Sequence, residues 1–242
     1  MKVYLITAED SFYTIPLLNE FINDGCEIVE VAIVDGFITK KRIISSLYIY
    51  GFYRFLKMSI ITIWYKLVGG KVEKHLVNNG LKVIHVNQVN EESFVKHLES
   101  LNFDLLLSHN CPQLIKKRLL KTAGLYSINL HMGLLPDYRG VFPIWRAMVN
   151  NEFFFGVTLH LMDEEFDNGK IILQESCLIS PEDSLFDLYI KAAHLGGRVI
   201  AKSIKLIEVG LVSFSNNDGL RKRYYGFPTV KEILALKKNN NT

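Results

Sequence analysis

The sequence predicts an α/β protein in which a mainly parallel sheet is flanked by helices. Short apolar runs alternate with helical patterns, as in the strand expected at 2–6, the helix at 14–25 and the strand at 26–34. Strand, helix and strand at this spacing indicate a βαβ unit, whose two strands lie parallel. The chain of 242 residues is 49% hydrophobic and 22% charged, which is typical of a globular protein with an ample core.

The same alternation continues along the chain, and Gly25 is expected to end the first helix. A long helix is expected to begin with Ser180 as N-cap and Pro181 in its first turn, and turn residues at 216–219 predict a β-hairpin. We therefore divide the chain into 1–180, which holds the sheet, and 181–242, a C-terminal appendage of a helix and a β-hairpin. The remaining expected strands are 81–86, 103–108, 126–131, 156–162 and 170–176, and the remaining helices are 91–101, 112–123 and 142–151.

Charge and cysteine content limit the classes of function. The net charge of +3 is small and its basic clusters are short, which argues against nucleic acid as the main partner. Cys26, Cys111 and Cys177 lie far apart and form no CxxC pair, as in proteins of a reducing compartment. Met1 leads directly into a strand pattern, so we expect no signal peptide and a cytoplasmic location.

The segment 47–68 is rich in aromatic and aliphatic residues, which raises the question of a membrane. Arg54, Lys57 and Lys66 interrupt it, whereas a spanning helix needs about 20 mostly apolar residues. We expect one or two helices that pack on the core or at a subunit contact, without stable membrane insertion. A helix that lies in the plane of a membrane is the second alternative.

The first expected strand carries no nucleotide-binding fingerprint. The residues that follow it, TAEDSFYT, contain no glycine, whereas a dinucleotide-binding turn needs GxGxxG. A P-loop is also absent from the sequence. The sheet alone therefore does not indicate a nucleotide cofactor.

The string SINLHMGLLPDYRG, at 127–140, holds the first candidates for chemistry. Asn129 and His131 are two apart at the end of a strand, so both side chains point to one side, where α/β sheets bind ligands. An amide donor beside an imidazole suits a carbonyl whose oxygen becomes negative during a reaction. Asp167, in the turn FDNG, is expected to orient the imidazole and relay protons. The other histidines considered are assigned structural or surface roles: His75, His85, His97, His160 and His194.

The strings INLHMGLLPDYRG and GVTLHLMDEEFDNGKII together resemble the formyltransferases that use 10-formyltetrahydrofolate, which include tRNA, purine-pathway and amino-sugar branches. The resemblance is specific from about Leu105 to Glu175. It implies a Rossmann-like sheet, the catalytic triad Asn129, His131 and Asp167, and folate held by two loops. The resemblance places these loop residues at the folate: Ser108, His109, Asn110, Asp163, Glu164 and Glu165. The loop sequence SHNCP departs from the glycine and leucine usual in the tRNA branch.

The forms GLLPxYRG and YYGFPT resemble the sugar N-formyltransferases, which act on nucleotide-linked amino-dideoxy sugars. This likeness implies a dTDP-4-amino-4,6-dideoxyglucose acceptor, a role in surface polysaccharide synthesis, a catalytic domain at 1–180 and a homodimer that uses 181–242. A base could stack on the tyrosines and a diphosphate could bind Arg139, although that arginine could instead tie down its own loop. The candidate substrate-binding residues are Tyr138, Arg139, Gly140, Tyr224 and Tyr225.

Three alternatives remain open. The first is a formyltransferase for another amine, of the purine-pathway glycinamide type. The second is a metal-dependent hydrolase built on His131 and the acids, although no HExxH or paired His/Cys spacing supports a metal and none is expected. The third is a folate-binding protein without catalysis, against which an intact Asn129, His131 and Asp167 set argues.

Overall fold

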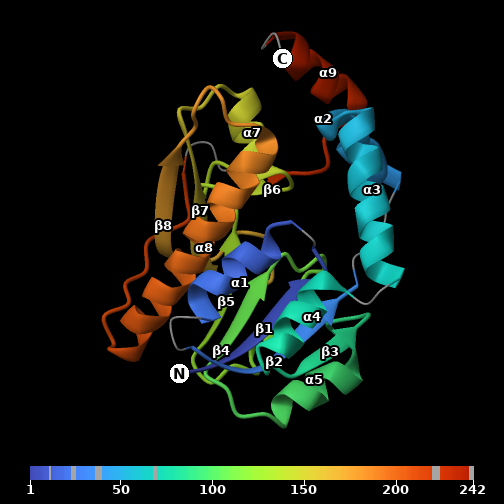
Figure 1. Cartoon of the computed structure of the whole chain (residues 1–242). Helices are drawn as coiled ribbons and strands as arrows, with labels where there is room; N and C mark the ends of the chain where they lie inside the picture. The colour runs from blue at the N-terminus through green and yellow to red at the C-terminus, as the bar shows by residue number, and fades with distance from the viewer. Residues whose placement is uncertain (11, 23–25, 36–39, 68–69, 220–223, 240–242) are drawn as a thin grey trace.

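The computed structural model describes all residues except 11, 23–25, 36–39, 68–69, 220–223 and 240–242. Within the described part, seven strands form one sheet in the order β3-β2-β1-β4-β5-β7-β8 (Figure 1). The first five in that order are parallel, and β7 and β8 continue the sheet antiparallel. The strands are β1 Lys2–Ala8, β2 Glu27–Val34, β3 Val83–Val86, β4 Leu105–His109, β5 Tyr126–His131, β7 Phe154–Leu161 and β8 Ile171–Leu178. The predicted α/β fold with a mainly parallel sheet is confirmed.

Helices cover both faces of this sheet. Helices α1 (Thr14–Ile22) and α8 (Leu185–Glu208) pack on one face, and α5 (Glu92–Glu99) and α6 (Lys117–Leu120) pack on the other. The side chains of β1 alternate accordingly, because Val3 and Leu5 join the first core whereas Tyr4 and Ile6 join the second. The strand order reverses between β1 and β4, so the carboxyl ends of β4 and β5 border the crevice where such sheets bind ligands.

The helix α8 begins four residues later than the sequence predicted. Ser184 is its N-cap: the Ser184 side chain accepts from the amide of Asp187, and the Asp187 carboxylate accepts from the amide of Ser184 at 2.9 Å. The sequence holds two consecutive Ser-x-x-Asp patterns, at 180–183 and 184–187, and the expected one, at Ser180, forms a turn instead. In that turn Asp183 accepts from the amide of Ser180 and pairs with Lys191 at 2.7 Å.

The predicted helix at 112–123 contracts to the single turn α6. The Gln113 side chain accepts from the amide of Val89 at 3.0 Å and donates to the carbonyl of Asn87 at 2.7 Å. Asn90 accepts from the amide of Lys116 at 2.8 Å. These contacts tie 113–116 to the loop after β3, and a helix there would break them.

The predicted hairpin around 216–219 is wrong for the described residues. Ser215 instead bridges Ile171 of β8, and β9 (Tyr224–Tyr225) pairs parallel with β6 (Arg139–Gly140). Asn217 is buried and donates to two carbonyls of the loop before β8. The described part of the tail therefore bonds to two segments that are distant in the sequence. The division at residue 180 stays a prediction, although α8 itself packs in the main core.

Helices α2 (Lys40–Tyr50) and α3 (Phe52–Leu67) lie beside the core, as Figure 1 shows. They meet at Gly51, whose φ of +79° is a left-handed conformation that glycine adopts without a Cβ clash. The expected helices are confirmed, but α3 turns several large apolar side chains to solvent and not to the core. No described helix is both long and apolar enough to cross a membrane. The remaining helices are α4 Lys71–Asn78, α7 Pro143–Val149 and α9 Val230–Asn239.

The two possible starts of α8 can be separated by mutation. Ser184→Ala removes the N-cap acceptor and is expected to lower the free energy of unfolding by about 1 kcal/mol. Ser180→Ala is the matched control and should change it by less than about 0.5 kcal/mol. Urea denaturation followed by circular dichroism measures both, and a larger loss for Ser180→Ala would contradict the observed N-cap.

Candidate active site

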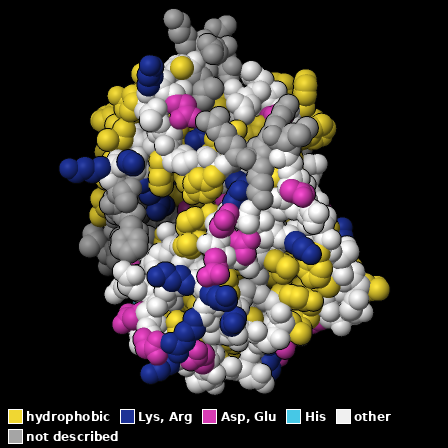
Figure 2. All heavy atoms as spheres, turned by 180° about the vertical axis from the view of Figure 1, so that it is seen from behind, with side chains coloured by type: hydrophobic (Ala, Val, Ile, Leu, Met, Phe, Trp, Pro, Cys, Tyr) yellow, Lys and Arg dark blue, Asp and Glu magenta, His cyan; other side chains and the backbone are white. Residues whose placement is uncertain are grey.

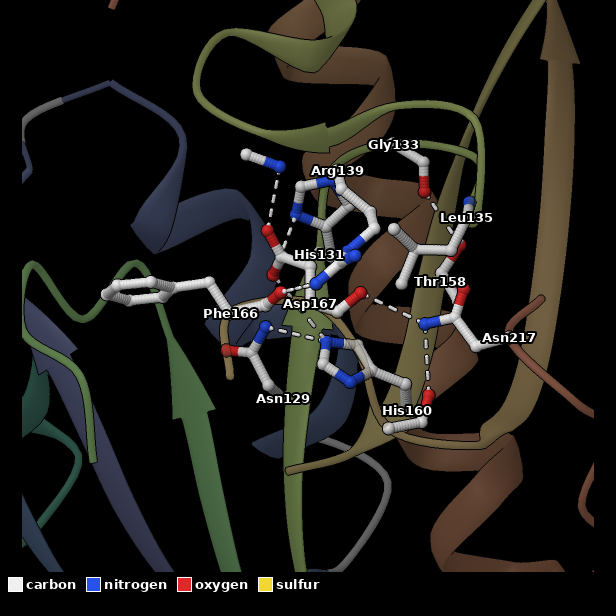
Figure 3. Close-up of polar contacts among 12 residues, drawn as sticks. Asn129, His131, Gly133, Leu135, Arg139, Thr158, His160, Phe166, Asp167 and Asn217 are labelled. Atoms are coloured by element: carbon white, nitrogen blue, oxygen red, sulfur yellow. Dashed lines mark hydrogen bonds and ion pairs between the residues drawn. The ribbon is translucent and has the colours of Figure 1, made fainter. Parts of the chain in front are cut away.

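The three side chains that the sequence singled out meet at the carboxyl end of β5. Asn129 and His131 are on that strand, and the loop between β7 and β8 brings Asp167 to them (Figure 3). His131 Nδ1 lies 3.4 Å from Asp167 Oδ1, and the two side chains are only 8% and 12% exposed. A buried imidazole facing a buried carboxylate is an arrangement that can hold and move a proton.

The ring of His131 lies between two oxygen acceptors. Its Nε2 is 2.7 Å from the carbonyl oxygen of Tyr138, while its Nδ1 faces the Asp167 carboxylate. A neutral imidazole carries one N–H and can donate to only one of these oxygens, whereas the cationic ring donates to both. Each ring nitrogen of His131 therefore lies near an oxygen that can accept a hydrogen bond from it.

Asp167 is held in an unusual backbone conformation. Its φ is +50°, in the left-handed region that asparagine and aspartate enter more readily than most residues. Its Oδ2 accepts from the amide of Gly140 at 2.8 Å, and its carbonyl accepts from Asn217 Nδ2 at 3.0 Å. Such a conformation persists where the surroundings determine it from several sides, as they do here.

His160 is a site residue that the sequence analysis missed. It lies on β7 directly opposite Asn129 and is 2% exposed. Its Nδ1 is 2.7 Å from the carbonyl of Leu161, and its Nε2 is 3.1 Å from Asn129 Nδ2. Burial lowers the pKa of His160, so the ring is neutral, donates through Nδ1 and accepts the Asn129 amide through Nε2. One signal was available, because Thr158 and His160 are two apart on a strand and share a face.

The candidate substrate residues divide into buried and exposed groups. Arg139 is buried and donates to the carbonyl of Phe166 at 2.6 Å, so it ties down a neighbouring loop. The Tyr138 hydroxyl donates to Glu152 at 2.6 Å, and the Tyr225 ring lies 4.3 Å from the Arg146 guanidinium. Tyr224 is 47% exposed, with its ring 6.2 Å from that of Phe166. Gly140 contributes its amide to Asp167.

The candidate folate residues lie at two loops. Ser108 and His109 are buried at the end of β4, and Asn110 follows with a φ of +58°. Burial lowers the pKa of His109 to about 4, although a backbone contact with Leu130 opposes this shift. Asp163 accepts from the amide of Glu165 at 2.9 Å, which shapes the second loop.

In the second loop, the side chains of Glu164 and Glu165 are exposed to water. Phe166 beside them is 42% exposed. In the described part of the chain, no three His, Cys, Asp or Glu side chains gather into a group that could hold a metal ion.

The state of His160 can be measured directly. Because burial lowers its pKa, we expect the ring to stay neutral at pH 7 and to carry its proton on Nδ1. Long-range proton–nitrogen NMR of the ring reports both properties, and the spectrum of His160→Gln assigns the signal. A ring that becomes protonated at or above the ordinary pKa of about 6.5 would contradict the contacts described here.

Several curated proteins are similar to this chain. The methionyl-tRNA formyltransferase of Halothermothrix orenii is 37% identical over 132 residues, which is 54% of this chain and 42% of that protein. The methionyl-tRNA formyltransferase of Kosmotoga olearia is 29% identical over 175 residues, which is 72% of this chain and 56% of that protein. The chain thus spans about half the length of these relatives.

Solved structures show the same fold. A sugar N-formyltransferase from Shewanella sp FDAARGOS_354 has a TM-score of 0.63 at 20% identity, covering 93% of this chain and 76% of that one. The N-formyltransferase from Helicobacter canadensis, in complex with folinic acid and dTDP-3-aminofucose, has a TM-score of 0.62 at 20% identity, with coverages of 93% and 71%. Phosphoribosylglycinamide formyltransferase from Bacillus halodurans has a TM-score of 0.63 at 20% identity, with coverages of 87% and 97%.

The family comparison covers the site itself. A sequence profile described as "Formyl transferase" matches residues 71–204, which run from α4 into α8 and make up more than half of the chain. The match includes Asn129, His131, His160 and Asp167. This chain belongs to the formyl transferase family.

Proposed function

We propose that this chain is a folate-dependent N-formyltransferase that moves a formyl group from 10-formyltetrahydrofolate to the amine of a nucleotide-linked amino-dideoxy sugar. The observation that carries the proposal is the contact between His131 and Asp167 beside Asn129, at the carboxyl edge of the sheet. In this transfer the amine attacks the formyl carbon and loses a proton, the carbonyl oxygen gains negative charge, and the folate nitrogen leaves and takes up a proton. Asn129 is placed for the oxygen, and His131 with Asp167 for the two proton transfers.

Asn129 is the donor for the carbonyl oxygen. Its amide has two N–H bonds, and His160 accepts one of them at 3.1 Å. The other N–H is then fixed in direction and can donate to the oxygen as charge builds on it. One well-placed donor of this kind lowers a barrier by about 3 kcal/mol.

His131 is the candidate for receiving the proton of the amine. In the structure its Nε2 contacts the carbonyl of Tyr138. For His131 to receive the proton, the amine of the acceptor would have to replace that carbonyl beside Nε2. Asp167, at 3.4 Å from Nδ1, stabilises the cationic ring that results. The left-handed backbone of Asp167 and its bond from Gly140 keep the carboxylate in position.

The exposed groups of the site fit a flat heteroaromatic donor. Phe166 and Tyr224 form an exposed aromatic pair at the loop that ends in Asp167, and aromatic faces stack on flat rings. 10-Formyltetrahydrofolate would supply the formyl group and would be held by the loops 108–112 and 163–167. The candidates there are Ser108, His109, Asn110, Asp163, Glu164 and Glu165.

The small sheet β6–β9 supports a sugar acceptor. The two strings that resemble sugar N-formyltransferases, GLLPxYRG and YYGFPT, are far apart in the sequence. In the structure Arg139 pairs with Tyr224 and Gly140 pairs with Tyr225, so the two strings form one unit beside Asp167. The dTDP-4-amino-4,6-dideoxyglucose acceptor, the role in surface polysaccharide synthesis, the cytoplasmic location and the homodimer through 181–242 stay predictions.

The acceptor and the role of Asn129 can be tested together. The chain is incubated with 10-formyltetrahydrofolate and, separately, a panel of nucleotide-linked amino sugars, glycinamide ribonucleotide and methionyl-tRNA, and the formamide product is detected by mass. We expect product with an amino sugar and a loss in kcat of about 10² to 10³ in Asn129→Ala. Product with methionyl-tRNA or glycinamide ribonucleotide alone would show that the acceptor is not an amino sugar. Unchanged turnover in Asn129→Ala would show that Asn129 is not the donor to the carbonyl oxygen.

A second variant tests His160 as a positioning residue. His160→Leu removes the acceptor that aims the Asn129 amide, and we expect kcat to fall about tenfold to a hundredfold while KM for the acceptor changes little. His160→Gln keeps an acceptor oxygen and should recover part of the loss. Equal kcat in His160→Leu and the unchanged chain would show that Asn129 does not depend on this contact.

A further inference from the structure

Helix α3 presents a continuous apolar surface to water. Its exposed large side chains recur at intervals of three or four residues, with adjacent pairs at 52–53 and 63–64, and this places them on one side of the helix. They are 45% to 79% exposed and lie together on one helix, whereas exposed apolar side chains on an ordinary surface are scattered singly. This surface, called the α3 face below, consists of Phe52, Tyr53, Leu56, Ile60, Ile63 and Trp64.

The stretch of sequence that contains α2 and α3 carries charge of one sign. Between Asp35 and Glu73 the sequence contains seven Lys or Arg residues and no Asp or Glu, although the whole chain has 28 of the former and 25 of the latter. Lys57 is exposed within the α3 face, and Lys40 and Lys41 are exposed at the start of α2. A partner that covers the apolar side chains must therefore also accept a concentrated positive charge.

The position of α3 leaves the α3 face accessible. Helices α2 and α3 stand at one flank of the molecule, beside the sheet and not between its helices (Figure 1). The view from behind shows yellow apolar and dark blue basic side chains together at the corresponding edge (Figure 2). A flat partner can approach such a flank without entering the core.

The charge pattern separates two possible partners. A second copy of the chain, related by a two-fold axis, would bring the same cations against each other, and like charges oppose association. The surface of an anionic bilayer attracts basic residues and accepts Phe, Tyr and Trp at the level of its headgroups. Lysine stems can lie along the apolar layer while their ammonium groups stay in water.

We propose that the α3 face docks on an anionic lipid bilayer, with α3 lying in the plane of the interface. At 16 residues α3 is shorter than the roughly 20 that a spanning helix needs. The apolar side chains enter the outer layer of the bilayer, and the cations of α2 and α3 meet the phosphates of acidic lipids. This inference is independent of the formyl acceptor, because it concerns a surface outside the site.

The experiment uses the full chain in vesicle flotation. We expect the chain to float with vesicles of phosphatidylglycerol mixed with phosphatidylcholine, and much less with phosphatidylcholine alone. High salt should release it, since screening weakens the attraction to the charged lipids. The double variant Ile60→Glu/Ile63→Glu should lose at least about tenfold in bound fraction, because it adds negative charge to the α3 face.

The matched control is Leu211→Glu, which changes a side chain that is 71% exposed but lies outside α2 and α3. It should float as the unchanged chain does, and circular dichroism checks that each variant is folded. No flotation with phosphatidylglycerol, or equal flotation of the double variant, would overturn the proposal. A concentration-dependent dimer in light scattering that the double variant abolishes would assign the α3 face to a second copy instead.

Discussion

The arrangement of this site depends on the contacts of the Asp167 carboxylate. One oxygen faces His131 on β5, and the other accepts from the backbone of Gly140 on β6. Gly140 has a φ of +99°, and a Cβ there would collide with the carbonyl of Tyr225. The same carboxylate therefore fixes the imidazole and places the small sheet β6–β9 beside it.

The register of β5 and β7 places the other side chains. Asn129 lies opposite His160, and His131 lies opposite Thr158. Since side chains alternate along a strand, a slip of β7 by one residue against β5 would move Thr158 and His160 to the face of the sheet opposite Asn129 and His131. Thr158 secures the loop that leaves His131, because its hydroxyl donates to the carbonyl of Gly133 at 2.7 Å. The pairing of β5 with β7 thus positions Asn129 and His131 together with the residues that hold them, His160 and Thr158.

The sequence predicted what depends on local order. Strand β5 was located at its observed bounds, and the shared side of Asn129 and His131 follows from the alternation of a strand. The role of His160 was missed because strand alternation shows only that it shares a face with Thr158, whereas its contact with Asn129 arises from the pairing of β7 with β5. The tail was misjudged for the same reason: a turn signal at 216–219 says nothing of partners more than 40 residues away. Helical periodicity likewise shows that α3 has an apolar side but not which way that side faces.

Two imidazoles, those of His131 and His160, lie in this site, and their contacts suit them to different roles. His160 donates through Nδ1 to Leu161 and must keep Nε2 as an acceptor for Asn129. A proton on Nε2 would place an N–H against the N–H of Asn129, and burial disfavours a charge on this ring. His131 has the opposite surroundings, with an acceptor at each nitrogen. Asp167 Oδ1 lies 3.4 Å from His131 Nδ1 and 3.8 Å from His160 Nε2, so the carboxylate is nearer to the ring that is proposed to exchange a proton. The ring of His160, whose pKa burial lowers, stays neutral and aims the amide.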